Sequence, residues 1–540
     1  MRNSMDRRTR VRFAPSPTGP LHMGGVRTAL YNYLFAKQRG GDFILRIEDT
    51  DSNRFVPGAE EYIIEALKWC GITPDEGVDS DGRVVETPSE RHPHAPYRQS
   101  QRRGIYRKYA EQLVANGYAY YAFDSSEELE AVRSAAESRG ETFTYNQKSR
   151  LSLRNSLTLS EEETARLLGE TTNWTIRFKM PENTVVAMDD LIRGHIEVNT
   201  DTLDDKVLWK RADELPTYHL ANIVDDHLME ITEVIRGEEW LPSLPLHYML
   251  YKAFGWEETR PRFAHLSLLL KPVGNGKLSK RDGDKMGFPV FPLRWVGADG
   301  TASHGYREDG YFPEAFVNML AMLGWNPGDD RELFSLDELV QAFSMEKVQK
   351  AGAKFNPDKA KWFNKEYLRM KSDEELTDLF VPILEGNGIK VTGCYKCPVS
   401  HDFAAGSVSK NYVKGVVALI KERATFVADF WTIAPYLFKA PKEYVEKDTA
   451  KFWKEENYTL AFKAAEHMAS YEGPWTAEAV GTELEEFIRG NEWPMGKVMN
   501  CLRLALSGAS SGLGIADILS FIGKEEFLSR MAAAGEKLGK

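Results

Sequence analysis

The sequence VRFAPSPTGPLHMGGVRTALYNYLFAK, residues 11–37, decides the fold of the first part of the chain. It begins with a short apolar strand, residues 11–14, which ends in a turn rich in proline. From residue 24 to residue 37 apolar side chains recur at helical spacing, and residues 43–48 have the composition of a second strand. A strand, a helix and a strand with short connections predict a parallel strand pair with a crossover. The predicted fold class is therefore α/β, with a doubly wound, Rossmann-type sheet.

Polar residues stand at the ends of these two predicted strands. Ser16 lies just past the first strand, and Glu48 ends the second. In doubly wound sheets, ligands bind beyond the carboxyl ends of the strands. We therefore expect Ser16 and Glu48 to line one crevice.

The pattern changes twice along the rest of the chain. Residues 103–207 contain an aromatic run, a polar helical stretch and one clear strand, and we interpret them as an α+β domain inserted into the Rossmann domain. The two halves of the Rossmann domain are then residues 1–102 and residues 208–268. Almost every periodic segment beyond residue 312 is helical, so residues 346–540 are predicted to form an all-helical region.

The composition limits the classes of protein that remain. A chain of 540 residues with 42% hydrophobic residues suggests three to five domains and excludes a disordered protein. No run reaches the roughly 18 apolar residues of a membrane span, and residues 1–12 lack the apolar segment of a secretory signal. Four cysteines are too few for a disulfide framework, which favours a cytoplasmic location. The net charge of −11 is only weak evidence against a nucleic-acid partner, because binding depends on local basic clusters such as residues 271–285.

Two glycine-containing segments have the composition of a nucleotide site. Residues 22–25, His-Met-Gly-Gly, precede the first helix, whose free N–H groups and positive dipole end suit a phosphate. Residues 277–281, Lys-Leu-Ser-Lys-Arg, are flanked by glycines and could close over a polyphosphate. This second segment is not a Walker A loop, because Leu278 follows the lysine where serine or threonine is required. Taken alone, each segment is explained at least as well as an ordinary loop.

Together, the two segments resemble the paired signatures of class I aminoacyl-tRNA synthetases. Two longer stretches resemble the glutamyl-tRNA synthetases in particular: RFAPSPTG at residues 12–19 with RIEDTD at residues 46–51, and PTYHLAN at residues 216–222 with VIRGEEW at residues 234–240. The alanine of the APSP sequence and the helical C-terminal half resemble the bacterial branch. The archaeal and eukaryotic branch, like the glutaminyl-tRNA synthetases, is expected to carry a β-barrel in that half.

The resemblance implies a two-step ligase reaction. Glutamate attacks the α-phosphate of ATP bound with Mg²⁺, and the terminal adenosine of tRNA(Glu) then takes the glutamyl group from the adenylate. The resemblance also implies that bound tRNA precedes glutamate activation and that a monomer is usual. It assigns the acceptor end of the tRNA to residues 103–207, a stem contact to residues 269–345 and the anticodon to residues 346–540.

Glutamate carries two carboxylates and one ammonium group, so its site needs cations for two anions and an anion for one cation. The resemblance assigns Arg12 to the side-chain carboxylate, Glu48 to the amino group and Arg236 to the main-chain carboxylate. A single arginine of this kind is more often a structural ion-pair partner, and only the matching motifs favour the functional role. The expected glutamate-binding residues are Arg12, Ala14, Ser16, Glu48, Tyr218, Asn222, Arg236 and Trp240. The expected ATP-binding residues are His22, Gly24, Gly25, Glu239, Lys277, Ser279, Lys280 and Arg281, of which His22, Lys277 and Lys280 are expected to be catalytic by stabilising the pentacovalent phosphate.

Several residues leave two interpretations open. The tyrosines at positions 118, 120 and 121, with Arg177, could hold the acceptor end or pack in a core, and Arg423 and Arg503 could contact the anticodon stem or be surface residues. No structural zinc is predicted, because residues 120–124 lack cysteine. Cys394 and Cys397 form a lone pair, which we interpret as two reduced thiols in a loop between helices. The segment at residues 286–305 is longer than the resemblance leads us to expect and has no assigned role.

Four other classes of protein share part of this pattern. A glutaminyl-tRNA synthetase is disfavoured by the helical C-terminal half. A truncated relative that modifies a tRNA base would lack that half. An inactive paralogue is expected to lose His22, Lys280 or the pocket residues, all of which are present. A metabolic nucleotidyltransferase would have no use for so long a helical region. Whether tRNA(Gln) is also charged is left open by the sequence.

Overall fold

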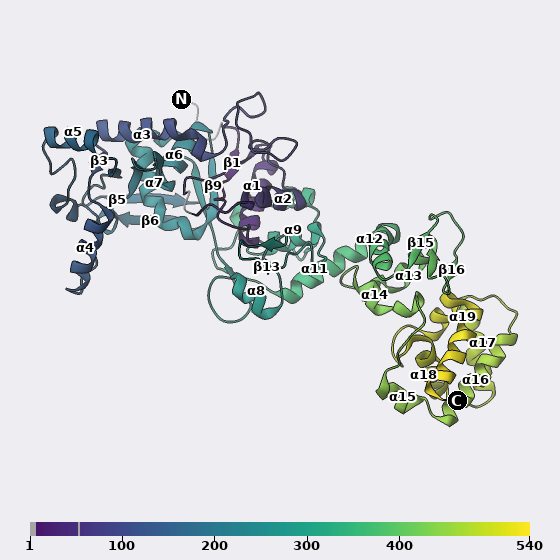
Figure 1. The fold of residues 1–540 in the computed structure, drawn as a ribbon. Coiled ribbons are helices and arrows are strands. Elements are labelled where there is room, and N and C mark those ends of the chain that lie inside the picture. Colours follow the sequence, from purple (N-terminus) through teal and green to yellow (C-terminus); the bar gives the residue numbers. More distant parts are fainter. Residues whose placement is uncertain (1–6, 52–53, 540) are drawn as a thin grey trace. The chain divides into compact units, whose positions relative to one another are not determined.

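The computed structural model describes residues 7–51 and 54–539. Two compact units make up the chain, Met1–Phe363 and Asn364–Lys540, and α11 (Pro357–Met370) crosses the division between them. Figure 1 shows the elements of both units in sequence colours. The first unit therefore extends to residue 363, whereas the sequence placed the start of the helical region at residue 346.

The centre of the first unit is a parallel sheet. Strand β1 (Arg10–Phe13) pairs in parallel with β2 (Asp42–Leu45), and α1 (Met23–Gln38) connects them, as predicted. The N–H of Thr232 donates to the carbonyl of Arg10 at 2.8 Å, which joins β1 to β9 (Glu233–Gly237) on its other side. Strand β10 (Arg262–Leu266) continues the parallel order beyond β9. The next strand of the chain, β2, lies on one side of β1, and β9 from the second half lies on the other side. A topological switch point therefore lies between β1 and β9.

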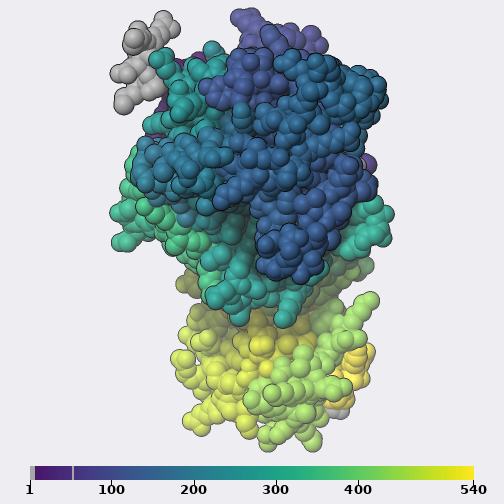
Figure 2. Space-filling model, turned by 90° about the vertical axis from the view of Figure 1, so that its left-hand side faces the viewer, coloured from purple at the N-terminus to yellow at the C-terminus, as the bar shows by residue number. Residues whose placement is uncertain are grey.

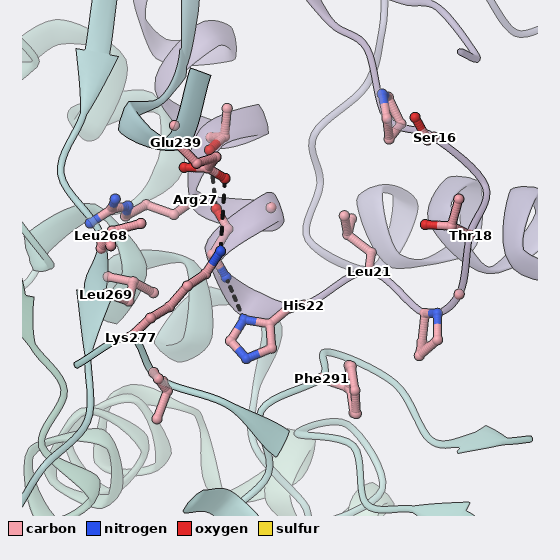
Figure 3. Close-up of a pocket in the computed structure, with 18 of the residues that line it drawn as sticks. Ser16, Thr18, Leu21, His22, Arg27, Glu239, Leu268, Leu269, Lys277 and Phe291 are labelled. Carbon is pink, nitrogen blue, oxygen red and sulfur yellow. Dashed lines mark hydrogen bonds and ion pairs between the residues drawn. The ribbon is translucent and has the colours of Figure 1, made fainter. Parts of the chain in front are cut away.

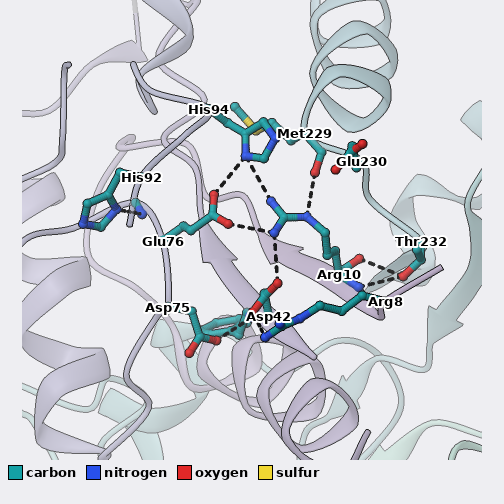
Figure 4. Close-up of polar contacts among 12 residues, drawn as sticks. Arg8, Arg10, Asp42, Asp75, Glu76, His92, His94, Met229, Glu230 and Thr232 are labelled. Atoms are coloured by element: carbon teal, nitrogen blue, oxygen red, sulfur yellow. Dashed lines mark hydrogen bonds and ion pairs between the residues drawn. The ribbon is translucent and has the colours of Figure 1, made fainter. Parts of the chain in front are cut away.

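A cluster of charged groups holds the amino-terminal edge of this sheet together (Figure 4). The guanidinium of Arg10 contacts Asp42 at 3.0 Å and Glu76 at 2.7 Å, and its Nε donates to the carbonyl of Met229 at 3.0 Å. The Nδ1 of His94 lies 3.1 Å from both Arg10 and Glu76. This cluster ties β1 to three separate loops at the end of the sheet away from the predicted crevice.

Two strands within residues 103–207 belong to the central sheet. Strands β5 (Val185–Asp190) and β6 (Gly194–Asn199) form an antiparallel hairpin, and β5 pairs with β10. The sequence interpretation gave all of residues 103–207 to a separate domain. It had no signal for this pairing, because strand composition does not reveal which sheet a strand will join.

The inserted domain has its own antiparallel sheet in the order β3-β4-β7-β8. Its strands are β3 (Ala119–Ala122), β4 (Thr175–Phe178), β7 (Val207–Lys210) and β8 (Leu215–Pro216), so the sheet continues past residue 207. Helices α3 (Arg103–Ala115), α4 (Ser126–Glu137) and α5 (Glu161–Glu170) accompany it, and Figure 2 shows the outer face of this region in blue. Tyr120 is buried and donates to Asp205 at 2.6 Å, which supports the core interpretation for this tyrosine, whereas Tyr118 is exposed.

The remaining elements of the first unit surround the sheet. The helices are α2 (Ala59–Trp69), α6 (Tyr218–Leu228), α7 (Leu244–Phe254), α8 (Lys280–Met286), α9 (Pro313–Met322) and α10 (Leu336–Ala342). Two short strand pairs are β11 (Leu269–Leu270) with β14 (Ala353–Lys354), and β12 (Trp295–Val296) with β13 (Ala302–Ser303). The segment at residues 286–305 packs on α1 and α2, since the hydroxyl of Tyr62 donates to Leu293 at 2.6 Å and the N–H of Met23 donates to Val290 at 2.9 Å.

The second unit is helical, as predicted, with one small sheet in addition. Its helices are α12 (Asp373–Gly386), α13 (Lys410–Ile420), α14 (Asp429–Ile433), α15 (Glu446–Phe452), α16 (Glu455–Ser470), α17 (Ala477–Gly490), α18 (Met495–Ser507) and α19 (Ile515–Leu538). Strands β15 (Lys390–Thr392), β16 (His401–Asp402) and β17 (Ser407–Ser409) form the sheet. Cys394 and Cys397 therefore lie in a loop between two strands, and the prediction of a loop between helices was wrong. Three-residue strands are too short for a period-2 pattern to stand out.

Candidate functional site

Two adjoining cavities lie at the carboxyl ends of β1 and β9, beside the start of α1. The first has a volume of about 500 Å³ and is bordered by residues of the His-Met-Gly-Gly segment and by Lys277 (Figure 3). The second, of about 240 Å³, is bordered by the ends of β1 and β9 and by α6. Ser16 borders both cavities and Glu48 borders the second, so the crevice predicted from the strand ends is confirmed at the switch point.

His22 is a neutral hydrogen-bond donor in the first cavity. It caps the N-terminus of α1, where its Nδ1 accepts the N–H of Gly24 at 3.2 Å. Burial, assisted by the charge of Lys277, lowers the pKa of His22 to about 4, so the ring is uncharged at neutral pH. Because Nδ1 accepts, the proton is on Nε2, and this buried nitrogen has no partner among the described residues. Such an N–H group is free to donate to a ligand.

The two glycines of the same segment also border the first cavity. A Cβ atom at Gly25 would lie 2.5 Å from Cδ1 of Leu21, so a larger residue would force that side chain to move. The absence of side chains at Gly24 and Gly25 leaves the first turn of α1 open to the cavity. The N–H groups of this turn already donate within the fold, that of Met23 to Val290 at 2.9 Å and that of Gly25 to the carbonyl of His22 at 2.8 Å, so it is the positive end of the helix dipole that suits an anion here.

The lysine-containing loop divides between two places. Lys277 borders the first cavity, and its Nζ lies 3.9 Å from Glu239. Lys280 starts α8 and borders a neighbouring cavity instead. Ser279 caps α8, its hydroxyl donating to Asp282 at 2.6 Å, and Arg281 is exposed outside both cavities of the crevice. The structure therefore brings Lys277, but not Lys280, Ser279 or Arg281, next to His22.

All eight residues expected to bind glutamate border the second cavity. They are Arg12, Ala14, Ser16, Glu48, Tyr218, Asn222, Arg236 and Trp240. Helix α6 places Tyr218 and Asn222 on one face, as their spacing predicted, and the ring of Tyr218 packs against that of Trp240 with centroids 4.1 Å apart.

The positive charge of Arg12 is neutralised within the fold. Its Nε and Nη2 donate to the two carboxylate oxygens of Asp226 at 3.0 and 3.2 Å, and both side chains are buried. Arg46 also donates to Asp226, at 2.8 Å, and to Glu48, at 3.0 Å. With its amide oriented to satisfy both neighbours, Asn222 fits between Arg12 and Asp226, its oxygen accepting from the arginine at 3.0 Å and its nitrogen donating to the carboxylate at 3.2 Å. Burial raises the pKa of Glu48, against the opposing effect of Arg46.

A second buried carboxylate extends this network toward the inserted domain. Asp225 accepts from Arg102 at 2.8 Å, from Tyr106 at 2.6 Å and from Gln99 at 2.9 Å. Arg102 and Tyr106 stand at the start of α3. Adjacent carboxylates of α6 thus face the glutamate candidates on one side and the first helix of the insertion on the other.

Arg236, in contrast, makes no ion pair with any carboxylate in residues 7–51 and 54–539. Its Nη1 donates to the hydroxyl of Tyr218 at 2.8 Å, and its Nε donates to Nε2 of His265 at 3.1 Å. Both Nη atoms lie 3.4 Å from Nδ1 of His247, and Nη2 donates to the carbonyl of Trp240 at 3.4 Å. These acceptors are all uncharged, so a buried positive charge at the edge of the cavity is left for a ligand.

Sequence reasoning missed Asp226, Arg46, Asp225 and His265. Arg46 lies in the RIEDTD motif, and Asp225 and Asp226 follow the PTYHLAN motif, whereas His265 lies outside both. No local pattern reveals a contact between residues that are 180 positions apart, as Arg46 and Asp226 are. Their burial despite their charge or polarity is visible only in the folded chain.

No cluster of three or more histidine, cysteine, aspartate or glutamate side chains in the described part of the chain is arranged to hold a metal ion. Within the same residues, no helix is long and apolar enough to cross a bilayer.

The side chain of Arg503 donates to the carbonyls of Leu513 and Ser510, so it stabilises a turn of the second unit. Arg423 is exposed.

Comparisons with known proteins agree along the whole chain. The model of the catalytic domain of class I tRNA synthetases (E and Q) matches residues 8–362, and the model of an anticodon binding domain matches residues 375–535. The glutamate–tRNA ligase of Porphyromonas gingivalis is 54% identical over 536 residues, which are 99% of this chain and 100% of that protein. That of Parabacteroides distasonis is 52% identical, over 98% of this chain and 99% of the relative. A crystal structure of a glutamate tRNA ligase from Elizabethkingia meningosepticum in complex with its amino acid is 50% identical and superimposes with a TM-score of 0.90, covering 98% of this chain and 100% of that chain.

Proposed function

Because the chain belongs to the bacterial glutamyl-tRNA synthetases, a branch of the class I enzymes, we propose a division of the reaction between its two cavities. The chain is a glutamate–tRNA ligase, which activates glutamate with ATP and transfers it to the 3′-terminal adenosine of tRNA(Glu). ATP occupies the first cavity and glutamate the second. Magnesium enters bound to the phosphates of ATP.

The position of the shared residues supports one orientation of glutamate. The reacting main-chain carboxylate has to meet the α-phosphate of ATP, and the residues that border both cavities include Ser16, Gly25 and Glu239. Arg12 and Arg236 border only the second cavity. We therefore place the side-chain carboxylate between these two arginines, and this proposal replaces the expected pairing of Arg236 with the main-chain carboxylate. Glu48 accepts from the ammonium group.

The uncompensated charge of Arg236 is the observation that carries the preference for glutamate. A carboxylate would complete an ion pair with this guanidinium, whereas the amide of glutamine would leave the charge buried without a partner. Since the charge of Arg12 is already matched by Asp226, Arg236 is the stronger discriminator.

Charge stabilisation of the phosphates is assigned to His22 and Lys277. The Nε2–H of His22 donates to a phosphate oxygen, the positive end of the α1 dipole favours the phosphates, and Lys277 neutralises charge on the leaving pyrophosphate. Lys280 joins them only after the loop moves, and positive φ angles at Gly274 (78°) and Gly276 (113°) mark the backbone that would act as the hinge.

The tRNA is proposed to bind along both units. The inserted domain takes the acceptor end, and the second unit, which the anticodon binding model matches at residues 375–535, takes the anticodon. A monomeric state and a cytoplasmic location stay predictions of the resemblance.

Aminoacylation tests this function directly. Purified protein is incubated with ATP, Mg²⁺ and labelled glutamate or glutamine, separately with tRNA(Glu) and tRNA(Gln), and acid-precipitable label is counted. Charging of tRNA(Glu) with glutamate is expected. Charging with glutamine alone, or no charging by folded protein, would contradict the proposal, and charging of both tRNAs with glutamate would keep the chemistry and broaden the substrate.

A further inference from the structure

His265 and Asp190 lie behind Arg236, outside the cavity, and are completely or almost completely buried. The ring of His265 lies between Arg236 and Asp190. Its Nε2 accepts from Nε of Arg236 at 3.1 Å, and its Nδ1 lies 2.6 Å from Oδ2 of Asp190. Three elements that are distant in sequence, β9, β10 and β5, supply one side chain each. Asp190 also holds β5 to β10 directly, because its Oδ1 accepts from the backbone N–H of His265 at 3.3 Å, whereas β9 and β10 are joined by backbone pairing.

The hydrogen bonds fix the tautomer of His265. The guanidinium can only donate, so Nε2 of His265 has to be unprotonated. The proton is then on Nδ1, where the carboxylate of Asp190 accepts it. Burial lowers the pKa of His265, although Asp190 opposes this effect, so the ring stays neutral.

The other imidazole beside Arg236 is neutral for the same reason. Burial lowers the pKa of His247 well below its usual value, with the charge of Arg236 adding to the effect. The Nε2 of His247 lies 3.3 Å from Nδ1 of His219, whose pKa burial lowers to about 4. Arg236 is thus surrounded by imidazoles that orient the guanidinium without adding a proton or removing its charge.

We propose that His265, held in one tautomer by Asp190, is a positioning residue that fixes the plane of the Arg236 guanidinium for the side-chain carboxylate of glutamate. This inference rests on the proposed function and deepens it. A carboxylate in place of His265 would hold Arg236 equally well but would neutralise it, whereas a neutral acceptor keeps the charge available for the substrate. Because the ring of His265 separates Asp190 from Arg236, the carboxylate can orient the guanidinium through the ring without pairing with its charge directly.

Asp190→Asn tests the tautomer with little change of shape. The amide oxygen can still accept from the N–H groups of Ile192 and Arg193, which Oδ1 of Asp190 accepts at 2.9 and 2.8 Å. The amide nitrogen then faces Nδ1 of His265 and favours the opposite tautomer, which places an N–H against Nε of Arg236. Asp189→Asn is the matched control, because this neighbouring carboxylate is exposed and contacts only the exposed ring of His195 among the described side chains.

The readout is tRNA-dependent ATP–pyrophosphate exchange, with KM measured separately for glutamate and for ATP. Asp190→Asn is expected to raise the KM for glutamate by about 10- to 100-fold and to leave that for ATP within about twofold, while Asp189→Asn resembles the unaltered protein. The ratio of kcat/KM for glutamate to that for glutamine falls in Asp190→Asn. An unchanged KM for glutamate, or an equal loss toward both substrates, would overturn the inference.

A second pair of variants covers the case in which Asp190→Asn does not fold. His265→Gln keeps an acceptor for Arg236, and His265→Leu has a similar size without one. The inference expects a change of a few-fold in the KM for glutamate for the first and about 10- to 100-fold for the second. Equal values for the two would overturn it. If the unaltered protein does not charge tRNA with glutamate, the proposed function fails instead.

Discussion

Arg12 and Arg236 border the same cavity, yet replacing each by glutamine is expected to have different effects on the stability of the substrate-free protein. Arg12→Gln removes the bidentate partner of the buried Asp226, which keeps Arg46 as its charged partner. Breaking a buried ion pair costs about 3–5 kcal/mol, and we expect about 3 kcal/mol because Arg46 remains. Arg236→Gln removes a buried charge that has no carboxylate partner within the described residues, so the free energy of unfolding should stay within about 1 kcal/mol or increase.

The effects on activity follow a different order from those on stability. Two charge-assisted hydrogen bonds from Arg236 to the substrate contribute about 1.5–3 kcal/mol each, so its loss should reduce kcat/KM for glutamate by at least about 100-fold. Urea denaturation followed by tryptophan fluorescence measures the stability, and tRNA-dependent pyrophosphate exchange measures the activity. If Arg236→Gln destabilises the protein as much as Arg12→Gln does, the charge of Arg236 is compensated by the fold and the reasoning fails.

Three further predictions concern the ATP site and the cysteine pair. Because burial lowers the pKa of His22 to about 4, the unfolded chain takes up a proton at this residue before the folded chain does, as the pH falls below about 6.5. The free energy of unfolding should therefore drop by about 2 kcal/mol between pH 7 and pH 5 on account of His22. The variant His22→Gln lacks this contribution, so its urea denaturation should show a shallower pH dependence. Lys277→Ala and Lys280→Ala should each lower kcat of pyrophosphate exchange by about 100-fold with little change in the KM for glutamate. A rise in the KM for glutamate as large as the fall in kcat would contradict a role limited to the phosphates. Cys394 and Cys397 should both react with a thiol reagent in native protein, and elemental analysis should find less than about 0.1 zinc per chain; stoichiometric zinc would refute the assignment as free thiols.

The sequence predicted those parts of the fold that depend on neighbouring residues. The strand–helix–strand start, the helix carrying Tyr218 and Asn222, and the helical second unit are all periodic patterns or short connections, and the structure confirms them. The hairpin of β5 and β6 could not be assigned to the central sheet, because its alternating pattern fits the edge of either sheet. Pairing between distant strands depends on the assembled fold.

The candidate site shows the same division. The identity of the glutamate candidates came from motifs, and the structure brings all eight to one cavity. Whether a given arginine keeps its charge for a ligand depends on partners far along the chain, such as Asp226 for Arg12 and His265 for Arg236. Motifs name the residues that line a pocket, but the distribution of charge among them is a property of the packed chain.

The central sheet also constrains how the chain can be synthesised. Arg12 and its partner Asp226 are 214 residues apart, and the whole inserted domain is made between them. At 5–20 residues per second, the ribosome needs roughly 10–40 s to deliver the second of the two, and until then β1 has a free edge and Arg12 has no counterion. The inserted domain, whose four strands lie between Ala119 and Pro216, can fold during this interval. The nascent chain can thus complete its inserted domain before the second cavity closes, and a truncated translation product that ends before β9 would expose the unfinished sheet to aggregation.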